Sequence, residues 1–319
     1  MSNTTSSTNI QQWASKDGAF HRQASQFRNF ISREPNSKFP PEADRYHLFV
    51  SLACPWAHRT LIVRGLKGLD SIIGVTVVDP LMEEKGWRFN PDLKIYDPNP
   101  VSGIEYLREL YLIANPQYNG RYTVPVLWDK KQKIIVNNES AEIIRMFNEV
   151  FDDIVPSSRG LNFYPEKLRS EIDSLNEWIY DTVNNGVYKA GFATSQEQYE
   201  INCRALFQSL DRIEGILGEK VFLTGNELTE ADIRLWTTIV RFDPVYHGHF
   251  KCNVKGIEKD YPNILRWARQ IYQLDDRIAN TLSIEHIKKH YYMSHTNINP
   301  TRVVPLGNGP DLTKPIVKK

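Results

Sequence analysis

The stretch FVSLACPWAHRTLIVRGLKG, residues 49–68, places Cys54 between an apolar segment and an amphipathic one. The preceding run RYHLFVS, residues 45–51, is typical of a buried strand. Pro55 follows the cysteine and suits the first turn of a helix, where its missing N–H has no partner to lose. Apolar side chains then recur near the helical period at Leu61, Ile62 and Leu66. The sequence therefore predicts a strand that ends just before Cys54 and a helix that begins just after it.

The same alternation of strands and helices continues for about a hundred residues. Residues 81–102 interrupt it with an aromatic- and proline-rich segment, which we expect to be an inserted loop. The order is β-α-β-α-β-β-α, which is typical of one compact α/β layer. After the strand and helix at Cys54, the predicted elements are a strand at 71–79, a helix at 103–116, strands at 123–128 and 133–138, and a helix at 139–151.

The second half of the chain has a different character, because only helical periodicity is found from residue 166 to about 291. The fold class is therefore α/β plus all-α, and no internal repeat is evident. The predicted domains are an irregular N-terminal arm at 1–43, an α/β domain at 44–151, a linker at 152–165, a helical domain at 166–291 and a C-terminal tail at 292–319.

Composition excludes several classes of function. The 319 residues are 41% apolar and 24% charged, which is a globular composition. A formal net charge of +1 gives no electrostatic footprint for nucleic acid or an anionic membrane, and the longest apolar run is too short to span a bilayer. Three scattered cysteines make no disulfide framework, so we expect a reducing, cytoplasmic setting. The Ser/Thr-rich N-terminus leaves an organellar transit segment open.

The position of Cys54 favours thiolate chemistry. Unpaired N–H groups and the dipole at a helix N-terminus stabilise negative charge, and His58 and Arg59 follow within the first turns. A small buried residue is the plain alternative for a free cysteine. Residue 57 is alanine, so a C-x-x-C dithiol is not formed and an external thiol must resolve any disulfide made at Cys54.

Several motifs resemble those of the glutathione S-transferase superfamily. They are TVPV, in which Pro125 matches the family's cis-proline, ESAEII at a helix start, and LTEADIRLW, which looks like the capping box of the family's core helix. CPWAHR, GWRF, RFDPVYHGHFKCN and the C-terminal HIKKHYY region narrow the resemblance to its Xi class, the glutathionyl-hydroquinone reductases. The resemblance implies an N-terminal thioredoxin-like, glutathione-binding domain, a C-terminal helical glutathione-transferase domain and a homodimer formed around residues 196–204.

Glutathione, as co-substrate, is the thiol that this resemblance supplies. We expect the Val124 backbone beside a cis Pro125 to pair with the cysteinyl unit in strand fashion. Glu139 and Ser140 open a helix and suit the γ-glutamyl ammonium and carboxylate, although plain helix capping is the alternative. Trp87 and Arg121 are assigned to the same site, Trp87 by resemblance alone.

Three tyrosines match those that the family places over the cysteine: Tyr188, Tyr246 and Tyr291. A phenol can protonate a quinol ring or donate a hydrogen bond to a thiolate. We assign proton transfer to Tyr188 and thiolate stabilisation to Tyr246 and Tyr291, with Tyr292 an open alternative to its neighbour. The expected reaction reduces an S-glutathionyl-hydroquinone through a mixed disulfide between Cys54 and glutathione, with oxidised glutathione as the second product.

Other interpretations stay open at this point. They are an Omega-type thiol transferase or dehydroascorbate reductase, a non-catalytic binding module of the same fold, and a conjugating transferase that uses Ser51. His247, His249 and Cys252 stand close together, and the alternation of the histidines suits a strand. Their spacing matches no zinc pattern, so we expect no metal.

Overall fold

The computed structural model describes residues 18–93, 95–156 and 160–316 of the chain. These residues divide into two compact units, one of Arg22–Leu161 and the other of Asn162–Lys319 together with the short segment that ends at His21. The division falls inside the segment predicted as a linker, residues 152–165. Each unit is described by itself.

The first unit is built on a four-stranded sheet of order β2-β1-β5-β6. β1 and β2 are parallel, whereas β5 is antiparallel to both β1 and β6. Leu48 at the centre of β1 pairs with Val75 on one side and Leu127 on the other. All four predicted strands are confirmed, although each is shorter than its apolar run: β1 (Tyr46–Val50), β2 (Gly74–Val77), β5 (Val126–Asp129) and β6 (Ile134–Asn137).

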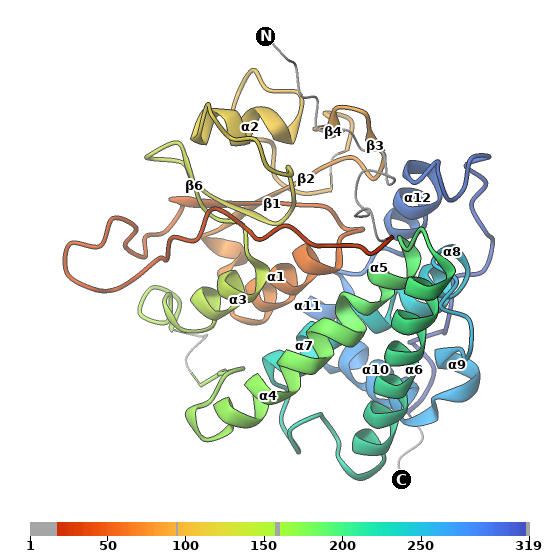
Figure 1. Ribbon diagram of the computed structural model, residues 1–319. Coiled ribbons are helices and arrows are strands. Elements are labelled where there is room, and N and C mark those ends of the chain that lie inside the picture. Colours follow the sequence, from red (N-terminus) through yellow and green to blue (C-terminus); the bar gives the residue numbers. More distant parts are fainter. Residues whose placement is uncertain (1–17, 94, 157–159, 317–319) are drawn as a thin grey trace. The chain divides into compact units, whose positions relative to one another are not determined.

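Helices cover both faces of this sheet, which explains why every residue of β1 is buried. Figure 1 shows α1 (Pro55–Leu66) and α3 (Ser140–Glu149) on one face and α2 (Leu107–Ala114) on the other. The segment expected to be only a loop, residues 81–102, also holds a small hairpin of β3 (Met82–Glu83) and β4 (Gly86–Trp87). Gly86 has a φ of 90°, which a residue with a side chain would rarely adopt in this turn.

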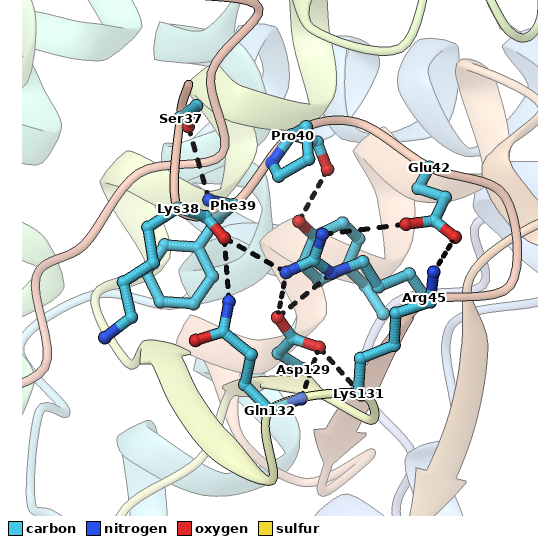
Figure 2. Close-up of polar contacts among 10 residues, drawn as sticks. Ser37, Lys38, Phe39, Pro40, Glu42, Arg45, Asp129, Lys131 and Gln132 are labelled. Atoms are coloured by element: carbon cyan, nitrogen blue, oxygen red, sulfur yellow. Dashed lines mark hydrogen bonds and ion pairs between the residues drawn. The ribbon is translucent and has the colours of Figure 1, made fainter.

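The N-terminal arm is anchored to the turn between β5 and β6. Arg45 donates to the buried Asp129 carboxylate at 2.6 and 3.0 Å and to the Lys38 carbonyl at 3.0 Å (Figure 2). Tyr46 donates to the Pro40 carbonyl at 2.7 Å. Gln132 also donates to the Lys38 carbonyl (Figure 2). These bonds satisfy buried polar groups and fix the point where the arm enters β1.

In the described part of the second unit the regular secondary structure is helical apart from isolated bridge residues, and loops join the helices. The predicted capping box is confirmed at the start of α7, where Thr229 and Asp232 accept each other's backbone N–H. The helices are α4 (Arg169–Ile179), α5 (Gly186–Gly191), α6 (Gln196–Glu219), α7 (Glu230–Ile239), α8 (His247–His249), α9 (Ile257–Asp260), α10 (Pro262–Leu274), α11 (Asp276–Ala279) and α12 (Ile284–Ser294).

The C-terminal tail lies against the helices of its own unit. Arg269 donates to the Asp311 carbonyl at 3.0 Å, and Lys288 donates to the Asn308 side chain at 2.8 Å. A hollow of about 300 Å³ lies between this tail and helices α7, α10 and α12, and no predicted site residue lines it. Among the described helices, none is long and apolar enough to cross a membrane.

Candidate active site

Cys54 is the N-cap residue of α1, as the sequence predicts. Its N–H donates to the Ser51 carbonyl at 3.1 Å, and its own carbonyl accepts the first bond of the helix, from His58, at 3.0 Å. The side chain is partly exposed, and its thiol lies 3.5 Å from the Val124 carbonyl oxygen. The sulfur is thus accessible beside the N–H groups of a helix start, where a thiolate is favoured.

The positive charge near Cys54 is organised around Trp56. The buried Arg59 guanidinium lies 4.5 Å from the Trp56 ring centroid and 3.5 Å from the Ser140 hydroxyl. Arg59 therefore links the start of α1 to the start of α3. His58, the other predicted contributor, is fully buried.

The peptide bond between Val124 and Pro125 is cis, which confirms that prediction. Within the described chain the Val124 N–H makes no hydrogen bond, and the Val124 carbonyl receives only the Cys54 thiol. A backbone donor and acceptor therefore stand next to the sulfur. This is the arrangement that an extended peptide uses when it pairs with an exposed edge.

Glu139 and Ser140 stand at the start of α3. Glu139 is the N-cap residue, and its carboxylate accepts the Ala141 N–H at 3.2 Å, so the plain capping role that the sequence left open is present. The other carboxylate oxygen accepts the Ser25 hydroxyl at 3.1 Å. Ser140 is buried, with its hydroxyl toward Arg59. A helix start with a neighbouring guanidinium can bind a carboxylate.

Trp87 and Arg121 also belong to the first unit. Trp87 ends β4 and is buried, which fits its plain alternative as a packed tryptophan. Arg121 is half-buried two residues before Thr123, and its N–H donates to the Gln23 side chain at 3.1 Å. Burial lowers the pKa of Arg121, and the positive charge of Arg22 lowers it further.

The second unit brings the three predicted tyrosines together. The phenol oxygen of Tyr291 lies 2.5 Å from that of Tyr188 and 3.1 Å from that of Tyr246. Tyr246 and Tyr291 are almost completely buried, and Tyr188 is 8% exposed. Burial raises the pKa of Tyr246 and Tyr291 well above the ordinary value, so both stay protonated at neutral pH.

The structure distinguishes the adjacent residues Tyr291 and Tyr292. Tyr292 donates instead to the Pro244 carbonyl at 3.3 Å, so Tyr291 is the member that joins the tyrosine cluster. Two π-helical turns, Tyr180–Asn184 and Phe242–Tyr246, bring Tyr188 and Tyr246 to it. Such turns add a residue to the helical repeat and occur often at functional sites.

His247 and His249 lie in the short helix α8, as the predicted helical domain requires, so their alternation does not mark a strand. His249 shares a 3.1 Å hydrogen bond with His295, and burial lowers the pKa of His249 to about 3. Cys252 is fully buried, and burial raises its pKa well above the ordinary value. In the part of the chain that the structure describes, no group of three or more histidine, cysteine or acidic side chains has metal-binding geometry.

Ser51 is poorly suited to activate a thiol. Its side chain is completely buried, and its hydroxyl accepts the Ala53 N–H at 3.2 Å. The hydroxyl therefore stabilises the turn that leads into α1. This geometry disfavours the conjugating transferase.

Sequence reasoning missed one group of residues, which lies in the N-terminal arm. Arg22, Gln23 and Ser25 each contact a residue at or beside the predicted glutathione site. The arm has no apolar periodicity and was expected to be irregular, and its pairing with β6 depends on long-range contacts that no local pattern encodes.

Comparisons with known proteins agree with this arrangement. Residues 53–150 match the family model for the N-terminal domain of glutathione S-transferases, and residues 196–270 match the model for the C-terminal domain. The chain is 54% identical to glutathione S-transferase omega-like 2 of Schizosaccharomyces pombe over 96% of this chain and 99% of that protein. It is also 54% identical to the glutathionyl-hydroquinone reductase YqjG of Escherichia coli, over 94% and 92% of the two chains.

Solved structures extend the similarity to the fold. The crystal structure of the glutathione S-transferase Xi from Phanerochaete chrysosporium has a TM-score of 0.89 and 54% identity, and the match covers 92% of this chain and 94% of that one. The glutathione-bound structure of YqjG has a TM-score of 0.87 over 94% of this chain and 97% of that one.

Proposed function

This chain belongs to the Xi class of the glutathione S-transferase family, and we propose that it reduces S-glutathionyl-hydroquinones to hydroquinones. The observation that carries the proposal is the partly exposed thiol of Cys54 at the start of α1, beside the Val124 carbonyl and N–H. The relative YqjG, which is named for this activity and has a glutathione-bound structure, supports the same substrate class.

The proposed reaction has two steps at one sulfur. The Cys54 thiolate attacks the glutathione sulfur of the substrate, and the bond between that sulfur and the ring carbon breaks. The electron pair of that bond stays with the ring, which takes a proton and leaves as hydroquinone. A second glutathione thiolate then attacks the mixed disulfide, releases oxidised glutathione and restores the Cys54 thiolate. The substrate is thereby reduced and two molecules of glutathione are joined.

Five residues would hold glutathione in this proposal. The Val124 backbone pairs with the cysteinyl unit, which presents the glutathione sulfur to Cys54. Glu139 pairs with the γ-glutamyl ammonium, and Ser140 with the N–H groups of α3 binds the γ-glutamyl carboxylate. Arg121 supplies positive charge for a carboxylate and Trp87 an apolar wall.

Tyr188 is the proposed proton donor to the hydroquinone ring. The Tyr188 phenol shares a hydrogen bond with the buried Tyr291 phenol, and Tyr188 is the most exposed of the three tyrosines. Stabilisation of the thiolate by Tyr246 and Tyr291 stays a prediction. Because Tyr246 and Tyr291 are buried, we propose that they also hold Tyr188 in place, through the hydrogen bond that Tyr291 shares with Tyr188.

The experiment is turnover of a glutathionylated hydroquinone with added glutathione, in the wild-type protein and in Cys54→Ser. We expect release of free hydroquinone that disappears in the variant, and a single glutathione on Cys54 by mass spectrometry. A Cys54 adduct without hydroquinone release would favour thiol transfer. Absence of both adduct and turnover would favour a binding module.

The proposal also covers the oligomeric state and the cellular location. We propose a homodimer formed around residues 196–204 of α6, where Ile201 is 54% exposed, and a cytoplasmic location, which the three free cysteines support. Light scattering of the purified protein and of Ile201→Glu tests the first. Imaging of the tagged full-length chain tests the second.

A further inference from the structure

The N-terminal arm extends the sheet of the first unit along the free edge of β6. The Asn29 N–H donates to the Val136 carbonyl at 3.0 Å, and the Asn138 N–H donates to the Phe27 carbonyl at 3.1 Å. Arg28 forms an antiparallel bridge with Asn137 between these two bonds. The arm is therefore held in register, and its residues before Phe27 have fixed directions.

Those earlier residues reach three parts of the proposed glutathione site. The Arg22 guanidinium lies 4.5 Å from the ring centroid of Trp56. Trp56 follows Cys54 by two residues in the sequence. Gln23 accepts the Arg121 N–H at 3.1 Å, and Ser25 donates to the Glu139 carboxylate at 3.1 Å. The arm thus contacts the three segments that carry the Cys54 thiol, the Arg121 guanidinium and the Glu139 carboxylate.

Positive charge gathers around Trp56 and Arg121. Arg22 and Arg59 both stack on Trp56 at 4.5 Å, and the charge of Arg22 lowers the pKa of the half-buried Arg121. The positive charge of these guanidinium groups attracts an anion. Glutathione at neutral pH carries two carboxylates and one ammonium, so it offers such an anion.

We propose that Arg22 is a glutathione-binding residue that, together with Arg121, binds a carboxylate of the tripeptide. The inference rests on the proposed function, because it takes glutathione as the ligand of this site. Trp56 holds the Arg22 guanidinium by a cation–π contact, and Gln23 and Ser25 hold the arm against Arg121 and Glu139. Because Arg22 is already held in place, its side chain loses less conformational freedom when glutathione binds.

The test is the affinity of the full-length protein for S-methylglutathione, a thioether that cannot form a disulfide with Cys54. We expect Arg22→Gln to weaken binding by about five- to tenfold, and Arg22→Lys to recover part of the loss. The salt dependence of the affinity should also become shallower in Arg22→Gln, because one screened charge is gone. A purely structural role would not change that dependence.

Arg33→Gln is the matched control, because it removes the same charge from the same arm. Arg33 donates to the Val150 carbonyl at 3.0 Å at the far end of α3. Unchanged affinity in Arg22→Gln would overturn the proposal, and so would an equal loss in both variants, which would make the arm a structural support alone.

The glycyl ethyl ester of S-methylglutathione identifies the carboxylate. If Arg22→Gln no longer weakens binding of the ester, Arg22 meets the glycyl carboxylate, and if the loss persists, it meets the γ-glutamyl one. Either result supports the proposal. Hydroquinone release is measured separately at saturating glutathione, so its absence in the wild-type protein would reject the proposed reaction without touching the affinity result.

Discussion

The phenol oxygens of Tyr188 and Tyr291 lie 2.5 Å apart, although 103 residues separate the two side chains in the sequence. Tyr246 approaches the same Tyr291 oxygen at 3.1 Å, so Tyr291 is the centre of a three-membered network. Because burial raises the pKa of Tyr246 and Tyr291, these hydroxyls keep their protons and can donate along the network toward Tyr188.

Removal of the Tyr188 hydroxyl should slow hydroquinone release but not disulfide exchange at Cys54. We expect Tyr188→Phe to slow hydroquinone release about 10²-fold or more, because the ring loses its proton donor. Reaction of Cys54 with glutathione disulfide should be unchanged, since disulfide exchange needs no ring proton. Stopped-flow absorbance and mass spectrometry measure the two steps. Tyr272→Phe in α10 is the control, and an unchanged release rate in Tyr188→Phe would exclude the assigned role.

Tyr291→Phe should act through Tyr188. The substitution removes the oxygen that joins Tyr188 to Tyr246. We expect turnover to fall about tenfold, with an unchanged KM for glutathione, because the first unit's binding residues are intact. Steady-state kinetics at varied glutathione measure both constants. Wild-type kcat in this variant would make the network a packing feature only.

Glu139→Gln tests the assigned contact with the γ-glutamyl ammonium. The amide keeps an acceptor for the Ala141 N–H but loses the charge. We expect the KM for glutathione to rise about tenfold, which is the cost of one charge-assisted hydrogen bond. Glu149→Gln, at the other end of α3, should leave the KM unchanged. If both variants behaved like wild type, capping would be the only role of Glu139.

Asp232→Ala should destabilise the second unit. The Asp232 carboxylate is fully buried and accepts the N–H groups of Leu223 and Thr229 and the indole N–H of Trp267 at 2.9–3.0 Å. Its loss leaves these donors buried without a partner, so we expect the free energy of unfolding to fall by about 3 kcal/mol. Urea unfolding measures the change. Asp276→Ala at the exposed start of α11 should cost much less, and an equal loss would contradict this account.

Acid should destabilise the fold through its buried histidines. Burial lowers the pKa of His47 to about 4 and that of His249 to about 3. Below about pH 6.5 the unfolded chain takes up protons that these folded side chains refuse, so stability falls as pH drops from 6.5 toward 4. His47 alone would contribute about 3 kcal/mol at pH 4.

Unfolding measured across this pH range checks the prediction. His47→Gln should flatten the pH dependence, because glutamine does not titrate and can still bond to the Thr76 hydroxyl that His47 meets at 2.8 Å. A variant with the full wild-type slope would assign the acid sensitivity to other groups.

The local patterns of the first unit predicted its elements well. Apolar runs gave the four strands, and the helix start at Cys54 followed from Pro55 and the spacing of the leucines. The small hairpin at β3 and β4 was not predicted, since two-residue strands leave no periodic signal. In the second unit, the π-helical turns before Tyr188 and at Tyr246 were also missed, because an added residue in a helix depends on packing rather than on local composition.

The sequence by itself determined the cysteine at residue 54, the absence of a second cysteine at residue 57 and the family, because these depend on residue type at short spacing. Only the tertiary structure decided that Tyr291 rather than Tyr292 meets Tyr188, and that Arg22, Gln23 and Ser25 lie beside Trp56, Arg121 and Glu139. Neighbouring tyrosines look alike in a sequence, and an irregular arm carries no periodicity. Their partners are set by long-range packing, which joins residues far apart in the sequence, up to the 114 positions between Ser25 and Glu139.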